Sequence, residues 1–221
     1  MIKEEFNNGL LGFLNASPTP FHATLNMAGM FENAGFTRLS EVEKWNLKEG
    51  GKYYVTRNDS SIIAFTYPKS KNYLMVGAHT DSPNLKLKPN PVIKEHGVIK
   101  FGVESYGGLL LTPWFDRDLS LAGRISYLNN QGEIESAIVD VEKKIAIIPS
   151  LAIHLDDKAN KDKTVNKQTD LCPVLTTNKE FDFKLFLNWQ LEKKGIHEVN
   201  EIYTHELSFY DTQKASFVGL K

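Results

Sequence analysis

The chain has 221 residues, of which 41% are hydrophobic and 24% are charged, as is ordinary for a soluble globular protein with a sizeable core. Its 26 basic and 27 acidic residues leave a formal net charge of −1, so no global charge favours nucleic acid or an anionic membrane as a partner. The single cysteine excludes a disulfide framework and a cysteine-rich metal site, and neither a signal peptide nor a membrane-length apolar run is visible, so we expect a cytoplasmic protein.

Two helices are predicted at the start of the chain. Apolar side chains recur at helical spacing between Phe6 and Leu14, which is typical of an amphipathic helix. A second helix is expected to begin after Thr19, a good N-cap residue, with Pro20 in its first position. Gly35 is well placed to end this helix, because glycine readily adopts the left-handed conformation found at helix C-termini.

A hairpin and a buried strand are predicted next. Residues 52–68 contain two β-rich runs separated by Asn58 to Ser60, a typical turn sequence. The apolar run NYLMVGA, residues 72–78, is expected to form a central strand that is buried on both faces. Helices combined with such a strand predict an α/β domain. His79 would lie just beyond the carboxyl end of this strand, where open α/β sheets bind their ligands.

The character of the chain changes after Pro89 and Pro91, where β patterns dominate. Hairpins are predicted around His96–Gly97 and around residues 129–132, and the run KKIAIIP, residues 143–149, is expected to add a strand.

The remaining segments alternate in type. Residues 156–170 contain almost no apolar side chains and are expected to form an exposed, mobile loop. A helix is predicted before Gly195, and residues 201–211 alternate as a strand does.

These patterns together place a domain boundary near Pro89 to Pro91, between an α/β part and a β-rich part of the chain.

His79 is the first candidate for chemistry. A lone histidine is usually structural, but this one follows a predicted central strand, and Asp81 lies two residues further along. A bent loop would bring the Asp81 carboxylate to the far ring nitrogen, which fixes the histidine tautomer and makes it a better metal ligand. The His-x-Asp triplet is short, and by itself it has low specificity.

Four blocks of sequence together are far more specific. They are SPTPFHA, VGAHTDSPNLKLKP, YGGLLLTPWFDRDLSLAGR and IPSLAIHLDD, and they occur in this order along the chain. In these blocks the chain resembles the aspartyl aminopeptidase / aminopeptidase I family of dinuclear zinc exopeptidases, from about Ser17 to Gln213.

The resemblance implies a zinc-peptidase-like α/β sheet domain with an inserted β-rich dimerisation domain. The first would comprise residues 1–90 and resume over residues 210–221, and the inserted domain would occupy residues 91–209. It implies a metal-dependent aminopeptidase that removes an acidic or neutral N-terminal residue from peptides with a free N-terminus. His79 would bind one of two metal ions, which would be zinc, with cobalt or manganese as alternatives. Asp81 would be a catalytic residue that supports His79. The inserted domain would build a homo-oligomer from dimers, and His154 would contact substrate in the active site of a neighbouring subunit.

The resemblance also implies that this chain corresponds to an N-terminal half, inactive alone. Family members continue well beyond its last residue, and the bridging carboxylate, the general-base glutamate and further ligands lie in that continuation. The rival hypothesis is a non-catalytic assembly or interaction fragment. In that case the β-rich domain still pairs subunits, while His79 and Asp81 are relics of a metal site.

Other polar residues have structural interpretations. The run WFDRDLSLAGR alternates in charge from Asp116 to Arg124, which favours a salt-bridged surface or interface segment. His22 would lie in the first turn of a helix, where a structural hydrogen bond is favoured. His154, with apolar neighbours, would be structural if seen alone.

Overall fold

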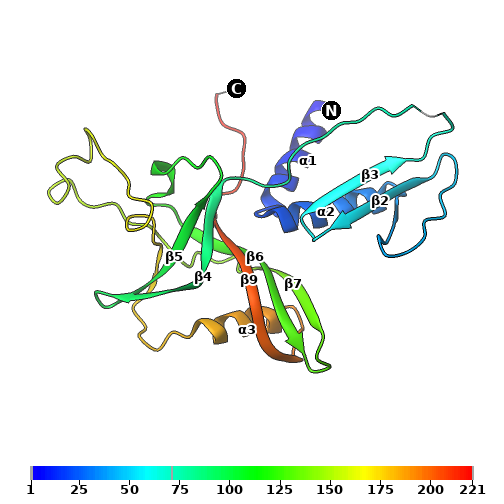
Figure 1. Cartoon of the computed structure of the whole chain (residues 1–221). Helices are drawn as coiled ribbons and strands as arrows, with labels where there is room; N and C mark the ends of the chain where they lie inside the picture. Colours follow the sequence, from blue (N-terminus) through cyan, green and yellow to red (C-terminus); the bar gives the residue numbers. More distant parts are fainter. Residues whose placement is uncertain (1, 71, 221) are drawn as a thin grey trace. The chain divides into compact units, whose positions relative to one another are not determined.

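The computed structural model describes residues 2–70 and 72–220, which form two compact units (Figure 1). One unit is Met1–Ser82 together with Ala215–Lys221, and the other is Pro83–Lys214. The chain therefore leaves the first unit and returns to it, with a mainly β unit between. The dimerisation role of the second unit stays a prediction.

The first unit opens with the two expected helices, α1 (Ile2–Ala16) and α2 (Pro20–Asn33). The side chain of Thr19 accepts a hydrogen bond from the His22 backbone N–H, so Thr19 is the predicted N-cap. Gly35 has φ +80°, and its N–H donates to the last turn of α2, as expected for a glycine that ends a helix.

A three-stranded sheet completes the regular structure of this unit. Its order is β1 (Thr37–Arg38), β2 (Lys52–Arg57) and β3 (Ser61–Thr66). β2 and β3 form the predicted hairpin, and Asn58 and Asp59 adopt left-handed φ values of 53° and 54° in its turn.

The central strand predicted over residues 72–78 is wrong for this structure. These residues are assigned no strand, and the side chains of Leu74, Met75 and Val76 are 96%, 88% and 90% exposed. A fully apolar strand requires a hydrogen-bonding neighbour and cover on both faces, and the three-stranded sheet of the described chain supplies neither here. The sequence pattern identifies an apolar, strand-like run, but it does not identify the neighbouring strands with which such a run would pair.

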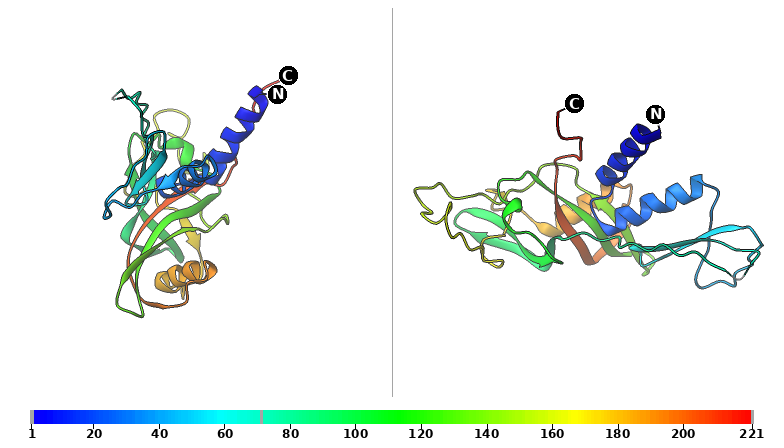
Figure 2. Two further views of the ribbon diagram at one scale, coloured as in Figure 1. Left: turned by 90° about the vertical axis from the view of Figure 1, so that its right-hand side faces the viewer. Right: turned by 90° about the horizontal axis from the view of Figure 1, so that it is seen from above.

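The second unit is a six-stranded antiparallel sheet with one helix on a face (Figures 1 and 2). The strand order is β7-β6-β9-β4-β5-β8. The strands are β4 (Asn84–Glu95), β5 (Val98–Tyr106), β6 (Leu119–Asn129), β7 (Ile134–Asp140), β8 (Val174–Thr176) and β9 (Val199–Asp211); the helices are η1 (Thr112–Trp114) and α3 (Phe183–Lys193).

Local turn chemistry accounts for the correctly predicted hairpins. His96 and Gly97 have φ values of 50° and 78° between β4 and β5, and Gly132 has φ 82° between β6 and β7. Gly195, with φ 78°, follows α3 as expected.

β4 runs through Pro89 and Pro91 with a register shift between Leu87 and Val92, so both prolines lie within a strand.

The run at residues 143–149 does not form the regular strand that was predicted. Ala146 bridges Leu119, Ile147 bridges Val174, and Ile148 bridges Phe115. The pairing partner changes at every residue, so no ladder with a single neighbour develops.

The pairing of β6 with β9 is the main long-range ladder of the second unit. Its register extends from Leu119 opposite Asp211 to Asn129 opposite Val199. Gly123 lies within it at φ 151°, and a Cβ atom there would come within 2.0 Å of the Glu206 carbonyl oxygen. Only glycine therefore allows the two backbones to approach this closely.

α3 covers the hydrophobic core that this ladder organises. Leu187 and Leu191 of the helix are fully buried, as are Leu121, Ile125 and Phe209 of the sheet. Burial of each such side chain contributes roughly 1.5–3 kcal/mol. The apolar face of the helix is thus what fixes it to the sheet.

His205 on β9 is a half-buried titratable group in this unit. Its Nε2 lies 3.3 Å from the Pro89 carbonyl oxygen, and its ring meets the edge of Phe183 at 5.2 Å between centroids. Burial lowers the pKa of His205, and the hydrogen bond to Pro89 offsets part of that effect while the charge of Lys86 adds to it. His205 is therefore stabilised in its neutral form.

We expect Gly123→Ala to destabilise the chain strongly. The φ value of 151° alone costs an L-residue roughly 1–3 kcal/mol, and the contact with the Glu206 carbonyl adds to this. Chemical denaturation of the 221-residue chain measures the loss. Gly102→Ala on β5 is the control, because its Cβ would meet atoms only at 3.4 Å or more. Equal stability of the two variants would contradict the close β6–β9 approach.

We expect His205 to make stability depend on pH. The unfolded histidine has a pKa of about 6.5, and the folded pKa is lower, so the unfolded state binds more protons between these values. The free energy of unfolding should be highest above about pH 6.5 and fall as the pH decreases toward the folded pKa. His205→Gln, which keeps a donor for Pro89, should remove this slope in denaturation series. His197→Gln, at an exposed histidine, should leave it. Parallel wild-type and His205→Gln curves would refute the assignment.

Candidate metal centre

His79 and Asp81 lie together in the first unit, on the loop that follows the exposed apolar segment. His79 Nδ1 is 2.9 Å from the Asp81 backbone oxygen and 3.1 Å from Asp81 Oδ1. Both neighbours are acceptors, so Nδ1 carries the proton and Nε2 keeps its lone pair. The His79 side chain is 81% exposed, which leaves Nε2 accessible to a metal ion. The Asp81 carboxylate thus orients the His79 ring, as the carboxylate partner of a histidine ligand would.

Thr80 fixes this loop to the β2–β3 hairpin. Its Oγ1 donates a 2.7 Å hydrogen bond to the Ser60 carbonyl oxygen, in the turn that follows Asn58 and Asp59. The two left-handed residues therefore shape the turn that presents this acceptor. Sequence reasoning missed this contact, because a threonine between two chemically conspicuous residues gives no signal of a distant backbone partner.

The described residues offer zinc one histidine but not a complete ligand set. Within residues 2–70 and 72–220, no group of three or more histidine, cysteine, aspartate or glutamate side chains could hold a metal ion. A catalytic zinc ion needs about three protein ligands. His79 fits as one of them, and the others are not provided by the described part of the chain.

Other side chains with metal-binding groups have partners of their own. His22 Nδ1 lies 2.8 Å from Thr19 Oγ1 at the start of α2. Asp116 Oδ1 accepts a 2.9 Å hydrogen bond from the Ser150 N–H, and Asp118 pairs with Lys144 at 2.7 Å.

The charged run from Asp116 to Arg124 is therefore a set of structural contacts, as its alternating signs predicted. Arg117 pairs with Asp211 at 3.2 Å, and Arg124 pairs with Glu206 at 2.6 Å. The first pair lies at one end of the β6–β9 ladder and the second near its middle, and both stabilise it modestly.

His154 belongs to the second unit. It lies in a turn in which the N–H groups of Leu155 and Asp156 both donate to the Ala152 carbonyl oxygen, at 2.8 and 3.2 Å. His154 is exposed, as are its neighbours Ile153 and Leu155, at 49% and 75%. Its apolar neighbours alone favoured a structural histidine of the β-rich domain, whereas the side chain lies exposed in this turn. The structure thus unites His79 with Asp81 and presents His154 on a separate surface turn.

Comparison with known proteins identifies the family. The model of the Aminopeptidase I zinc metalloprotease (M18) family matches residues 13–221. The chain belongs to this family. It is 50% identical over 226 residues to "Probable M18 family aminopeptidase 2" of Pseudomonas aeruginosa. The aligned region covers 99% of this chain and 52% of that relative. The chain thus spans about half the length of the curated relatives that it matches.

Solved structures of M18-type proteins share the fold. A structure described as the Ape4 and Nbr1 complex has a TM-score of 0.86 and 37% identity, covering 95% of this chain and 44% of that chain. Chaetomium thermophilum mApe1 has a TM-score of 0.81 and 29% identity, covering 98% of this chain and 53% of that chain. The mixed α/β architecture predicted from the sequence is confirmed.

Proposed function

We propose that the chain supplies the first metal ligand and a substrate contact of a zinc-dependent aminopeptidase. The observation that carries this proposal is the placement of His79 Nδ1 beside Asp81 in a chain of the M18 zinc metalloprotease family. The substrates would be peptides with a free N-terminus, from which an acidic or neutral residue is removed.

The roles of the residues follow from their geometry. His79 Nε2 would bind zinc, with two divalent ions in the complete centre and cobalt or manganese as alternatives. Asp81 holds the Nδ1 proton and raises the basicity of Nε2, and Thr80 fixes the loop. Zinc, when bound, polarises the scissile carbonyl and lowers the pKa of water. With one ligand of about three, the 221 residues alone would not hydrolyse peptides.

The second unit would pair subunits of a homo-oligomer built from dimers. One structural neighbour, with 26% identity and a TM-score of 0.78, is described as an "S. cerevesiae mApe1 dodecamer". On the second unit the exposed apolar side chains of Leu151, Ile153 and Leu155 flank His154, as is suitable for a contact surface. His154 would contact substrate in the site of a neighbouring subunit.

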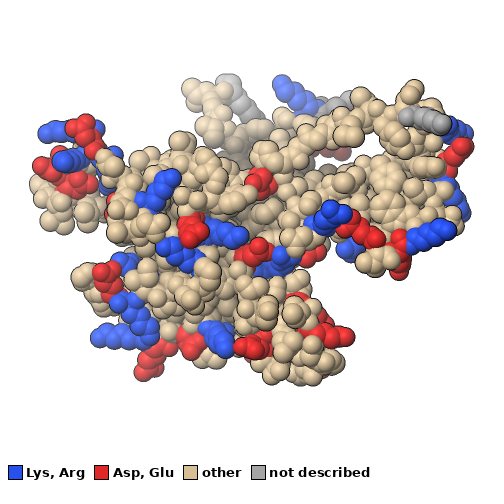
Figure 3. All heavy atoms as spheres, in the orientation of Figure 1, with Lys and Arg blue, Asp and Glu red and all other residues tan. Residues whose placement is uncertain are grey.

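The surroundings of the protein are proposed from charge and cysteine content. On the face drawn in Figure 3, basic and acidic side chains lie interspersed, which gives no support for nucleic acid as a partner. No helix of the described residues has the length and hydropathy needed to cross a membrane. The free thiol of Cys172 suits the reducing cytoplasm.

A second candidate is a non-catalytic assembly fragment, which the incomplete ligand set favours. The length of the source reading frame separates the two. A continuation of similar length that encodes carboxylate and histidine ligands supports the enzyme, and a stop after residue 221 supports the fragment.

We expect His79→Ala to remove one metal ligand in the full-length product of the reading frame. Bound zinc per subunit should fall and peptidase activity should be lost, because alanine offers the ion no ring nitrogen in place of Nε2. Asp81→Ala should weaken zinc affinity about 10–100-fold, a smaller effect. Metal analysis and hydrolysis of aspartyl and leucyl p-nitroanilides measure both.

His197→Ala is the control for loss of an exposed histidine, and it should match wild type. Unchanged zinc content in His79→Ala would refute the ligand assignment.

We expect His154→Ala to lower turnover while sparing zinc content and assembly, because His154 would contact substrate and not metal. Steady-state kinetics and the assembly's mass measure these effects. Wild-type kinetics in an intact oligomer would exclude the role.

A further inference from the structure

The turn that carries His154 is small and poorly covered. Inside the turn the N–H groups of Leu155 and Asp156 donate to the Ala152 carbonyl oxygen, and Leu151, Ile153 and Leu155 are 59%, 49% and 75% exposed. A single helical turn without packing is marginal in water. The direction in which His154 points must therefore be set by contacts outside the turn.

Asp116 fixes the start of this segment. Its N–H donates to the Ile148 carbonyl oxygen at 2.9 Å, and its Oδ1 accepts from the Ser150 N–H at 2.9 Å. Asp116 has φ 58°, a left-handed conformation that persists in a non-glycine residue only when the surroundings impose it. Hydrogen bonds from the Ser150 side chain and backbone lower the pKa of Asp116, and the charge of Lys163 lowers it further. The anchor is thus a carboxylate.

Lys163 fixes the end of the turn from the far limb of the loop. Its Nζ lies 3.3 Å from Asp156 Oδ2 and 5.0 Å from the centroid of the Phe115 ring. The side chains of Lys163 and Asp156 are only 27% and 19% exposed, so this pair is screened less than a surface ion pair. Lys163 thereby connects the last residue of the turn to the neighbour of Asp116.

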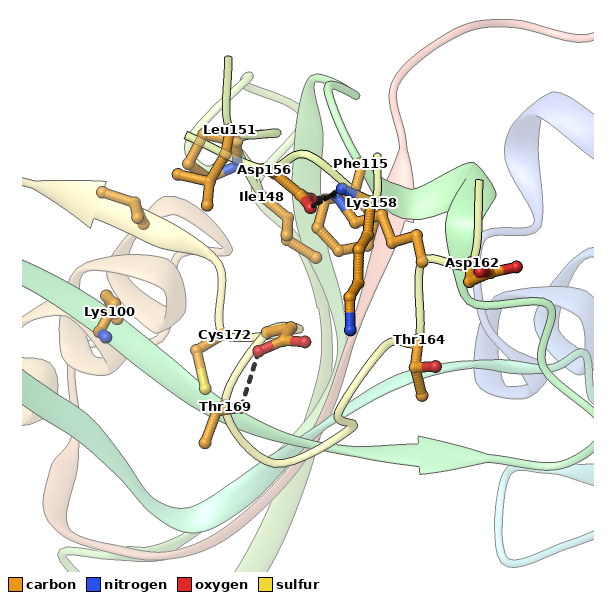
Figure 4. A pocket seen from close by; sticks show the side chains of 14 residues that line it. Lys100, Phe115, Ile148, Leu151, Asp156, Lys158, Asp162, Thr164, Thr169 and Cys172 are labelled. Atoms are coloured by element: carbon orange, nitrogen blue, oxygen red, sulfur yellow. Dashed lines mark hydrogen bonds and ion pairs between the residues drawn. The ribbon is translucent and has the colours of Figure 1, made fainter. Parts of the chain in front are cut away.

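A pocket of about 500 Å³ lies beside these contacts (Figure 4). Phe115, Ile148, Leu151 and Cys172 line it, as do the ion-paired residues Asp156 and Lys163. Because this space is not filled by side chains of the described residues, the turn lacks a packed base. The ionic and cation–π contacts of Lys163 take the place of that packing.

We propose that Lys163 is a positioning residue, which acts through Asp156 and Phe115 to hold the turn in the orientation that presents His154. This inference rests on the proposed substrate contact of His154. The nearby Lys161 offers a matched comparison, because it has the same charge, lies two residues earlier and is exposed on the same loop.

The test compares Lys163→Met, Lys163→Arg and Lys161→Met in the full-length product of the reading frame. Lys163→Met keeps an apolar stem of similar length and removes the charge. We expect kcat/KM for peptide p-nitroanilides to fall about tenfold, since small misplacements of a contacting group have effects of this order or larger. Zinc content should stay unchanged. Lys163→Arg should restore most of the activity, and Lys161→Met should match wild type.

Hydrogen–deuterium exchange over residues 150–157 gives a second, independent reading. The N–H groups of Ser150, Leu155 and Asp156 should exchange at least about fivefold faster in Lys163→Met than in Lys161→Met, because their hydrogen bonds depend on the anchored turn.

Unchanged exchange in Lys163→Met overturns the anchor. Faster exchange with wild-type kinetics, while His154→Ala is impaired, overturns the positioning role. Wild-type kinetics in His154→Ala itself overturns the proposed function, and the positioning role with it, whereas the exchange result still reports on the anchor.

Discussion

The β6–β9 ladder is the constraint on which the second unit depends. It brings Leu119 opposite Asp211, and the Thr212 N–H then donates to the Asp118 carbonyl oxygen at 3.0 Å. The first and last strands of this unit also lie side by side, because Leu85 and Lys86 of β4 pair with Phe209 and Ser208 of β9. In the first unit the Ala215 N–H donates to Asn15 Oδ1 at 2.7 Å, beside the end of α1. Backbone pairing between distant segments thus makes the excursion compatible with a single first unit.

The two candidate sites depend on different units of the chain. His79 and Asp81 depend on a hairpin of the first unit, because Thr80 bonds the Ser60 carbonyl in its turn. His154 depends on the second unit, where the Phe115–Asp116 segment lies immediately before β6. In our proposal each candidate histidine is therefore held by a segment next to a strand. Neither is held by a packed core, which explains why short polar contacts decide its orientation.

Sequence patterns predicted the elements whose causes are local. The cap at Thr19, the glycine at Gly35 and the hairpin turns act within a few residues, and their positions were correct. The strand over residues 72–78 was wrong because pairing depends on a neighbour that no local pattern reveals. The His79–Asp81 contact was predictable, since it spans two residues. The Lys163 contacts were not, because a lysine in a polar loop resembles its solvated neighbours.

The central proposal for this chain of the M18 family concerns the two ring nitrogens of His79. Nε2 would bind zinc while Nδ1 stays hydrogen-bonded to Asp81. The most direct measurement is an anomalous-scattering crystal structure of the full-length product at the zinc edge. The account predicts zinc about 2.0–2.1 Å from His79 Nε2, with Asp81 still on Nδ1. Zinc bound elsewhere with His79 free, or zinc on Nδ1 with Asp81 displaced, would contradict it.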